Sequence, residues 1–170
     1  MKGDHSPLFY WHEVMMDREN IERLLAAKLA EEDLFLVELT VAAEKGITVY
    51  VDGMENVSVK QCATVTRYLR DALGEAADDY EITVSSPGLD KPFRHPSQYV
   101  KNLEKSVEVT LDDGRKISGK LLNVSENGDI RMQEFSQKKS NNKAVKPALS
   151  DTITEIEFRH IKQTKKLVFI

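Results

Sequence analysis

Ser85 and Ser86 are candidate nucleophiles, and Asp90 and His95 follow them closely in the chain. A serine nucleophile needs a positioned general base and an oxyanion site. The four histidines are scattered along the sequence, although folding could bring them together, and no Gly-x-Ser-x-Gly elbow is present. We therefore expect both serine hydroxyls to bond the backbone around a Pro-Gly turn rather than to take part in catalysis.

The sequence also provides little for metal or cofactor chemistry. Nothing places a second carboxylate beside Asp90, and His95 alone makes no metal site. Cys62 is the single cysteine, which excludes an internal disulfide and argues against a cysteine-rich zinc site. No phosphate-binding or dinucleotide-binding glycine pattern is present. We expect no catalytic residue, no metal and no cofactor.

Basic residues in the second half are the candidates for contacts with RNA. They fall in two groups: Lys91, Arg94, Lys101 and Lys105, then Lys138, Lys139, Lys143 and Lys146. Lysine and arginine bind phosphates with an affinity that does not depend on base sequence. An ordinary solvated surface would carry the same residues, so charge alone leaves both interpretations open. The second half lacks the clustered aromatic residues of a platform for stacking single strands, so we expect weak base-specific recognition.

Charge is divided unevenly along the 170 residues, whose net charge is −4. Residues 1–90 carry 8 Lys and Arg against 18 Asp and Glu, whereas residues 91–170 carry 16 against 10. An acidic half followed by a basic half indicates two modules with different partners, although two ordinary surfaces would explain it equally well. No apolar run is long enough to span a membrane and no secretory signal is recognisable, so we expect a cytoplasmic protein.

The first module is predicted to be an α-β-β-α-β domain over residues 17–88. The expected elements are a helix at 17–32, strands at 34–41 and 47–51, a helix at 58–73 and a strand at 80–85. Ser58 and Gln61 form a capping-box pattern, and Gly74 is a suitable helix stop. Alternation in the first strand places Leu34 and Leu39 on opposite faces. This order predicts a three-stranded sheet with two helices on one face, preceded by a disordered extension at 1–16.

Residues 89–170 show a period of two and predict a small five-stranded β-barrel. The expected strands are 107–111, 116–124, 130–135, 152–158 and 165–170. Gly119 is expected to mark a bulge or bend, and Glu126-Asn127-Gly128 a hairpin turn. The Lys-rich stretch 136–150 is predicted to be a mobile basic loop. The two modules together make an α+β fold.

A proline-rich joint is predicted between the modules. It consists of Ser85, Ser86, Pro87, Gly88, Leu89, Asp90, Lys91 and Pro92. Pro87 fixes its own φ and pushes the preceding residue towards extended geometry, while Gly88 permits a positive φ. We expect a hinge of fixed shape rather than a flexible linker.

The stretch from Val84 to Pro92, VSSPGLDKP, resembles the signature of the RimP family of bacterial ribosome maturation factors, with Lys91 where the family has arginine. The resemblance covers roughly residues 17–170. It implies an N-terminal α/β domain, a C-terminal SH3-like or Sm-like barrel and a non-enzymatic role in assembly of the 30S subunit. The chain departs from the family at Glu104, where a glycine is usual before the first barrel strand, and in the length of the loop 136–150.

The partners that the resemblance implies are the free 30S subunit, with its 16S ribosomal RNA, and a basic small-subunit protein of the decoding centre. The protein would bind them as a monomer without membrane association. Two other functions remain open. A general Sm-like RNA-binding module would explain the basic barrel and would form rings, and a hydrolase would use Ser86 or Asp90.

Overall fold

The computed structural model describes residues 17–136 and 145–169, and the chain divides into two compact units after Pro87. Each unit has its own hydrophobic core. The expected extension at 1–16 and three of the candidate lysines, Lys138, Lys139 and Lys143, lie outside the described residues. Within the described part of the chain, no helix combines the length and apolar character needed to cross a membrane.

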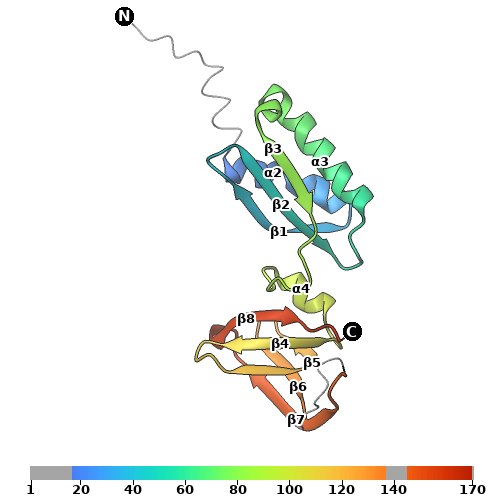
Figure 1. The fold of residues 1–170 in the computed structure, drawn as a ribbon, viewed down its shortest axis with the longest axis vertical. Coiled ribbons are helices and arrows are strands. Elements are labelled where there is room, and N and C mark those ends of the chain that lie inside the picture. Colours follow the sequence, from blue (N-terminus) through green and yellow to red (C-terminus); the bar gives the residue numbers. More distant parts are fainter. Residues whose placement is uncertain (1–16, 137–144, 170) are drawn as a thin grey trace, which may run out of the picture. The chain divides into compact units, whose positions relative to one another are not determined.

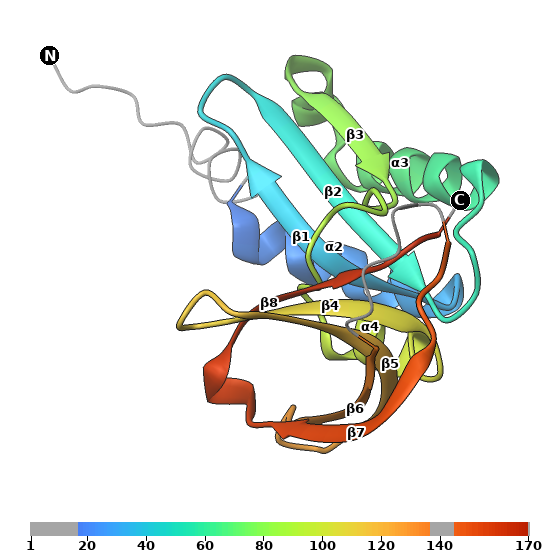
Figure 2. The ribbon, with the colours of Figure 1, turned by 60° about the horizontal axis from the view of Figure 1, so that its bottom comes forward.

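The first unit has the predicted α-β-β-α-β order, with a short 3-10 helix before its last strand (Figure 1). Its elements are α2 Arg18–Glu31, β1 Leu34–Val41, β2 Gly46–Gly53, α3 Val59–Leu73, η1 Gly74–Asp79 and β3 Glu81–Ser85. The sheet has the order β1-β2-β3, with β2 antiparallel to β1 and parallel to β3. Figure 2 shows α2 and α3 together behind this sheet, and both helices contribute buried side chains to its core.

Local side-chain chemistry fixes the ends of α3 as the sequence predicts. The Ser58 hydroxyl accepts a hydrogen bond from Gln61 N at 3.1 Å, and Gln61 Oε1 accepts one from Ser58 N at 2.9 Å. This reciprocal capping satisfies two backbone donors that the helix leaves unpaired. Gly74 ends the helix with a φ of 58°, in the left-handed region that favours glycine.

The second unit contains a five-stranded antiparallel sheet. Its elements are α4 Pro96–Lys101, β4 Ser106–Leu111, β5 Lys116–Val124, β6 Ile130–Phe135, β7 Leu149–Ile156, η2 Phe158–His160 and β8 Ile161–Lys166. The strand order is β7-β6-β5-β4-β8, and Figure 2 shows the sheet strongly curved. The five-stranded sheet is confirmed. No pairing joins the edge strands β7 and β8 within the described residues, so closure into a barrel is not shown.

The last two strands differ from their predicted positions. β7 begins before the expected 152–158 and β8 before the expected 165–170. The apolar end of the chain suggested a strand, but the residue that β8 buries completely is the polar Thr164. A strand whose inward side chain is polar has no hydrophobic alternation by which to recognise it.

Gly119 does not mark a bulge. It pairs in register with Val107 on β4 and Glu134 on β6. A Cβ at this position would lie 2.1 Å from the Gln133 carbonyl oxygen, so glycine is required by the close approach of the β6 backbone. The irregularity in β5 falls further along, after Leu121.

Candidate functional site

The proline-rich segment forms a tight turn. Lys91 N donates a hydrogen bond of 3.0 Å to the Gly88 carbonyl oxygen. Gly88 does not use the positive φ that glycine permits. A Cβ there would instead lie 2.7 Å from Asp90 Oδ1, so the carboxylate occupies the space that a side chain would need. The Ser85 hydroxyl donates to the Ser86 carbonyl oxygen at 3.2 Å, which is the local backbone contact expected of it.

The short helix α4 begins at a dense set of hydrogen bonds. Gln98 is buried, and its Oε1 accepts from Arg94 N at 2.6 Å and from His95 N at 3.0 Å. His95 Nδ1 accepts from Ser97 N at 3.2 Å, so the neutral imidazole caps the helix. Burial lowers the pKa of His95, which favours this neutral form.

Helix α4 and the residues before it are attached to β8. Phe93 N donates to the Thr164 carbonyl oxygen at 2.8 Å. The rings of Phe93 and Tyr99 meet edge to face, with centroids 5.0 Å apart. Burial raises the pKa of the Tyr99 phenol, while its hydrogen bond to Thr164 lowers it. The aromatic pair therefore has a fixed position on the sheet.

A cavity of about 570 Å³ opens next to this pair. Three separate parts of the second unit line it: the segment 93–100, the β5–β6 turn and η2. Its apolar lining is Phe93, Pro96, Tyr99, Val100, Val124 and Phe158, and its polar lining includes Arg94, His95, Ser125, Glu126 and Asn127. The fold thus places three aromatic side chains, Phe93, Tyr99 and Phe158, around one cavity, although Phe158 is far from the other two in the sequence.

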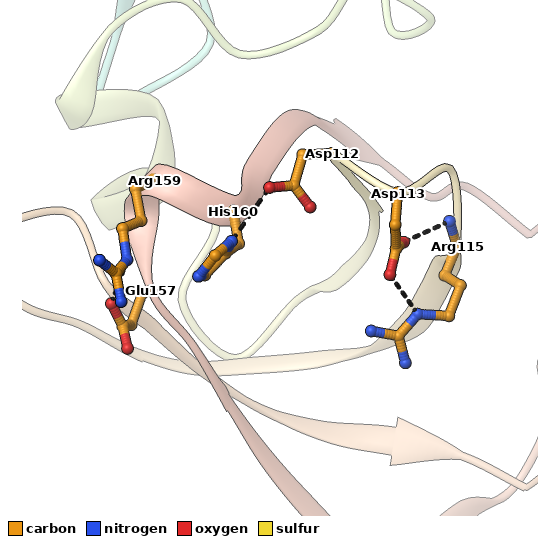
Figure 3. A network of polar contacts seen from close by, with 6 residues as sticks. All are labelled: Asp112, Asp113, Arg115, Glu157, Arg159 and His160. Carbon is orange, nitrogen blue, oxygen red and sulfur yellow. Dashed lines mark hydrogen bonds and ion pairs between the residues drawn. The ribbon is translucent and has the colours of Figure 1, made fainter.

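The β5–β6 turn and η2 hold the aromatic side chain at the cavity wall. Phe158 N donates to Asp129 Oδ1 at 2.8 Å. A Cβ on Gly128, whose φ is 87°, would lie 2.9 Å from the Phe158 ring, so the ring packs directly over this glycine. Two residues after Phe158, His160 Nδ1 lies 3.0 Å from Asp112 Oδ2 (Figure 3). The backbone of the same two residues is also joined, since Asp112 N donates to the His160 carbonyl oxygen at 2.9 Å.

The remaining polar contacts of this region are exposed. Arg159 Nε lies 2.7 Å from Glu157 Oε2, and Arg115 Nε lies 2.7 Å from Asp113 Oδ2 (Figure 3). Hydrogen bonds from the backbone and side chain of Arg115 lower the pKa of Asp113. Exposed ion pairs of this kind contribute little to stability. Arg115 and Arg159 are thus each paired with an acidic residue. Arg94, which lines the cavity, makes no ion pair among the described residues.

The structure places the candidate basic residues unevenly. Arg94 lines the cavity, and Lys101 and Lys105 lie at the end of α4 and just beyond it, with Lys105 Nζ donating to the Lys101 carbonyl oxygen at 2.8 Å. Lys91 lies in the turn before them, and Lys146 lies apart from them in the chain, just before β7. Strand β8 carries three further lysines that were not among the candidates, and none of them makes an ion pair in the described part of the chain: Lys162, Lys165 and Lys166.

The described residues contain no group of three or more His, Cys, Asp and Glu side chains that could hold a metal ion. Cys62 packs against the core of the first unit, and burial raises the pKa of its thiol. A partly buried thiol with a raised pKa is a poor nucleophile, because the thiolate is the reactive form.

Known proteins that are similar to this chain belong to the family whose signature the stretch 84–92 resembles. The model of the RimP N-terminal domain matches residues 21–90. Ribosome maturation factor RimP of Porphyromonas gingivalis is 30% identical over 111 residues, which cover 65% of this chain and 73% of that protein. The RimP of Christiangramia forsetii is 33% identical over 114 residues, covering 66% and 73%. The similarity to a solved Sm-like archaeal protein from Pyrobaculum aerophilum covers 44% of this chain and 52% of that chain, at 16% identity and a TM-score of 0.34. On the evidence of these relatives, the chain belongs to the RimP family.

Proposed function

We propose that this protein is a ribosome maturation factor that binds the free, immature 30S subunit and assists its assembly without a covalent step. The observation that carries the proposal is the 30–33% identity to ribosome maturation factors over 73% of their length. The cytoplasm is the compartment in which such a factor would act.

The division of charge supports a protein with two kinds of partner. Residues 1–90 carry 18 acidic against 8 basic residues, which complements a basic small-subunit protein. Residues 91–170 carry 16 basic against 10 acidic residues, which complements the phosphates of 16S ribosomal RNA. We expect the first unit to contact the protein and the second unit to contact the RNA.

Binding alone is sufficient for such a role. A factor that prefers one conformation of the immature subunit increases the population of that conformation, and no bond need be made or broken. Arg94, Lys101 and Lys105 are the candidate phosphate contacts, because they follow one another along α4 and its flanks. We further propose that the segment 85–92 holds the two units in a fixed arrangement, so that both partners are bound at once.

A clean deletion of the gene tests the proposal. The deletion strain should accumulate precursor 16S ribosomal RNA and contain fewer translating ribosomes, and a plasmid copy of the gene should restore both. Normal subunit profiles and normal 16S processing in the deletion strain would contradict the proposal. The alternative, a ring-forming Sm-like RNA-binding module, predicts a multimer in solution, whereas the proposed factor is expected to be a monomer by light scattering.

A further inference from the structure

We propose that the cavity beside α4 binds one unstacked nucleobase of single-stranded RNA, with a neighbouring phosphate on Arg94. The inference rests on the proposed function for its biological setting, because it names the RNA feature that the second unit would recognise. It rests on the structure for its chemistry, which concerns a single cavity within that unit.

The first argument is the aromatic wall. Phe158 is 56% exposed although it is a large apolar side chain, and Val100 on another lining segment is 45% exposed. A flat ring that remains accessible beside a cavity of about 570 Å³ offers a face on which a base can stack. Phe93 and Tyr99 supply further aromatic surface from another segment.

The second argument is that the wall is pre-organised. The backbone of Phe158 is tied to Asp129, and its ring lies over the bare backbone of Gly128. Asp112, in the β4–β5 turn, holds His160 through both a side-chain and a backbone contact. Two hairpin turns thus fix a three-residue 3-10 helix that carries one exposed ring. Side chains fixed before the ligand arrives lose less entropy on binding.

The third argument is the charge and polarity of the lining. Arg94 is exposed and makes no ion pair among the described residues, so its guanidinium is available to a phosphate. The exposed side chains of Glu126 and Asn127 provide a carboxylate and an amide, which can accept from and donate to the edge of a base. The cavity therefore combines an apolar lining with one cation that makes no ion pair and a few exposed polar groups. This combination is suited to a base and its neighbouring phosphate.

The test compares two RNAs that differ only in one base. Full-length protein is titrated into fluorescein-labelled, single-stranded RNA heptamers of one sequence, which are either unmodified or carry a central abasic site. The salt concentration is the same in both titrations. The phosphates are identical in the two RNAs, so any difference in affinity reports the base. We expect the unmodified RNA to bind about 5- to 150-fold more tightly, the range typical of one stacked base.

Variants locate the base on the protein. Phe158→Ala should abolish the difference between the two RNAs, while Phe158→Trp should keep it because the ring can still stack. Arg94→Ala should weaken binding of both RNAs and reduce the salt dependence. Two variants serve as controls and should leave the affinity for both RNAs unchanged. Ile153→Ala on β7 removes another exposed apolar side chain, and Arg23→Ala on α2 removes an arginine from the first unit.

The outcomes separate this inference from the proposed function. Equal affinity for the intact and abasic RNAs, or equal discrimination by Phe158→Ala and wild type, would overturn the nucleobase proposal even if the protein binds 30S subunits. Loss of 30S binding by Phe158→Ala without any binding of the heptamers would show that the cavity does not recognise an unstacked base of single-stranded RNA and would also overturn the nucleobase proposal. Clear base discrimination by a protein that ignores 30S subunits would support this inference and contradict the proposed function.

Discussion

The Tyr99 hydroxyl donates a hydrogen bond of 2.9 Å to Oγ1 of Thr164, a residue of β8 with no exposed surface. The carbonyl oxygen of the same Thr164 accepts from Phe93 N. One polar residue on β8 therefore anchors both the segment leading into α4 and the helix itself. The cavity lies against this anchored segment, so its shape depends on the contact.

Replacing either partner of this hydrogen bond should destabilise the second unit. Tyr99→Phe leaves the buried Thr164 hydroxyl without this donor, and we expect a loss of about 1 kcal/mol in the free energy of unfolding. Thr164→Val should cost a similar amount, and the double variant should cost less than the sum of the two. Urea unfolding followed by amide signals of the second unit measures all three, and strictly additive losses would show that the hydroxyls do not interact.

Glu104 has a φ of 63°, the left-handed conformation that favours glycine, at the position where the family resemblance expects a glycine. Its carboxylate forms an ion pair with Lys120. Glu104→Ala removes the ion pair but keeps the strained Cβ, whereas Glu104→Gly removes both. We expect the glycine variant to be more stable than the alanine variant by about 0.5–1 kcal/mol in thermal or urea unfolding. A glycine variant that is less stable than the alanine variant would contradict this explanation.

Gly119→Ala should be severely destabilising. The added Cβ would meet the Gln133 carbonyl oxygen at 2.1 Å, and strand pairing leaves that backbone no freedom to move away. We expect a loss of about 3 kcal/mol, at the upper end of overpacking costs. Gly46→Ala is the matched control on β2, because its Cβ would meet only the Ala42 methyl group at an ordinary 3.7 Å. Similar costs for the two substitutions would disprove the role assigned to the close strand approach.

His95 should make the stability of the second unit depend on pH. Burial lowers its pKa below the ordinary 6.5, so the unfolded chain binds more protons than the folded one just below pH 6.5. Stability should therefore rise as the pH increases towards 6.5 and should fall as the pH decreases below it. His95→Asn keeps a good helix cap and removes the titration, so its stability should depend less on pH. Unfolding free energies at pH 5.5 and 7.5 measure the difference, and an unchanged pH dependence in the variant would rule out this group.

The proline-rich segment should matter for binding rather than for folding. Replacing Pro87 and Pro92 by glycine adds backbone freedom between the units, and we expect weaker binding to 30S subunits. The amide spectrum of each unit should remain that of a folded domain. Unchanged affinity would show that a fixed arrangement of the two units is not needed.

The sequence predicts elements well where the signals are local. The capping box at Ser58 and the stop at Gly74 lie within one helix, and both occur as predicted. The residues that β1 buries could not be predicted from such local signals. Leu34 and Leu39 are both buried, although an odd spacing places them on opposite faces of a regular strand. The register shift between Leu36 and Glu38 reverses the alternation, and such a bulge depends on the partner strand.

The cavity could not be predicted from the sequence as well as the helices and strands could. Arg94 was identified from charge alone, but the ring of Phe158 lies more than sixty residues away in the chain. Only the pairing of five strands brings η2, the β5–β6 turn and α4 to one place. η2 and α4 have three and six residues, which is too short for a helical hydrophobic pattern to reveal them.

Sedimentation with ribosomal particles tests the central claim most directly. Purified protein is mixed separately with free 30S subunits and with 70S ribosomes, and each mixture is centrifuged through a sucrose cushion. The proposed function predicts that the protein pellets with free 30S subunits and remains in the supernatant with 70S ribosomes. Absence from both pellets, or equal recovery with both particles, would contradict a maturation factor that acts on the free subunit.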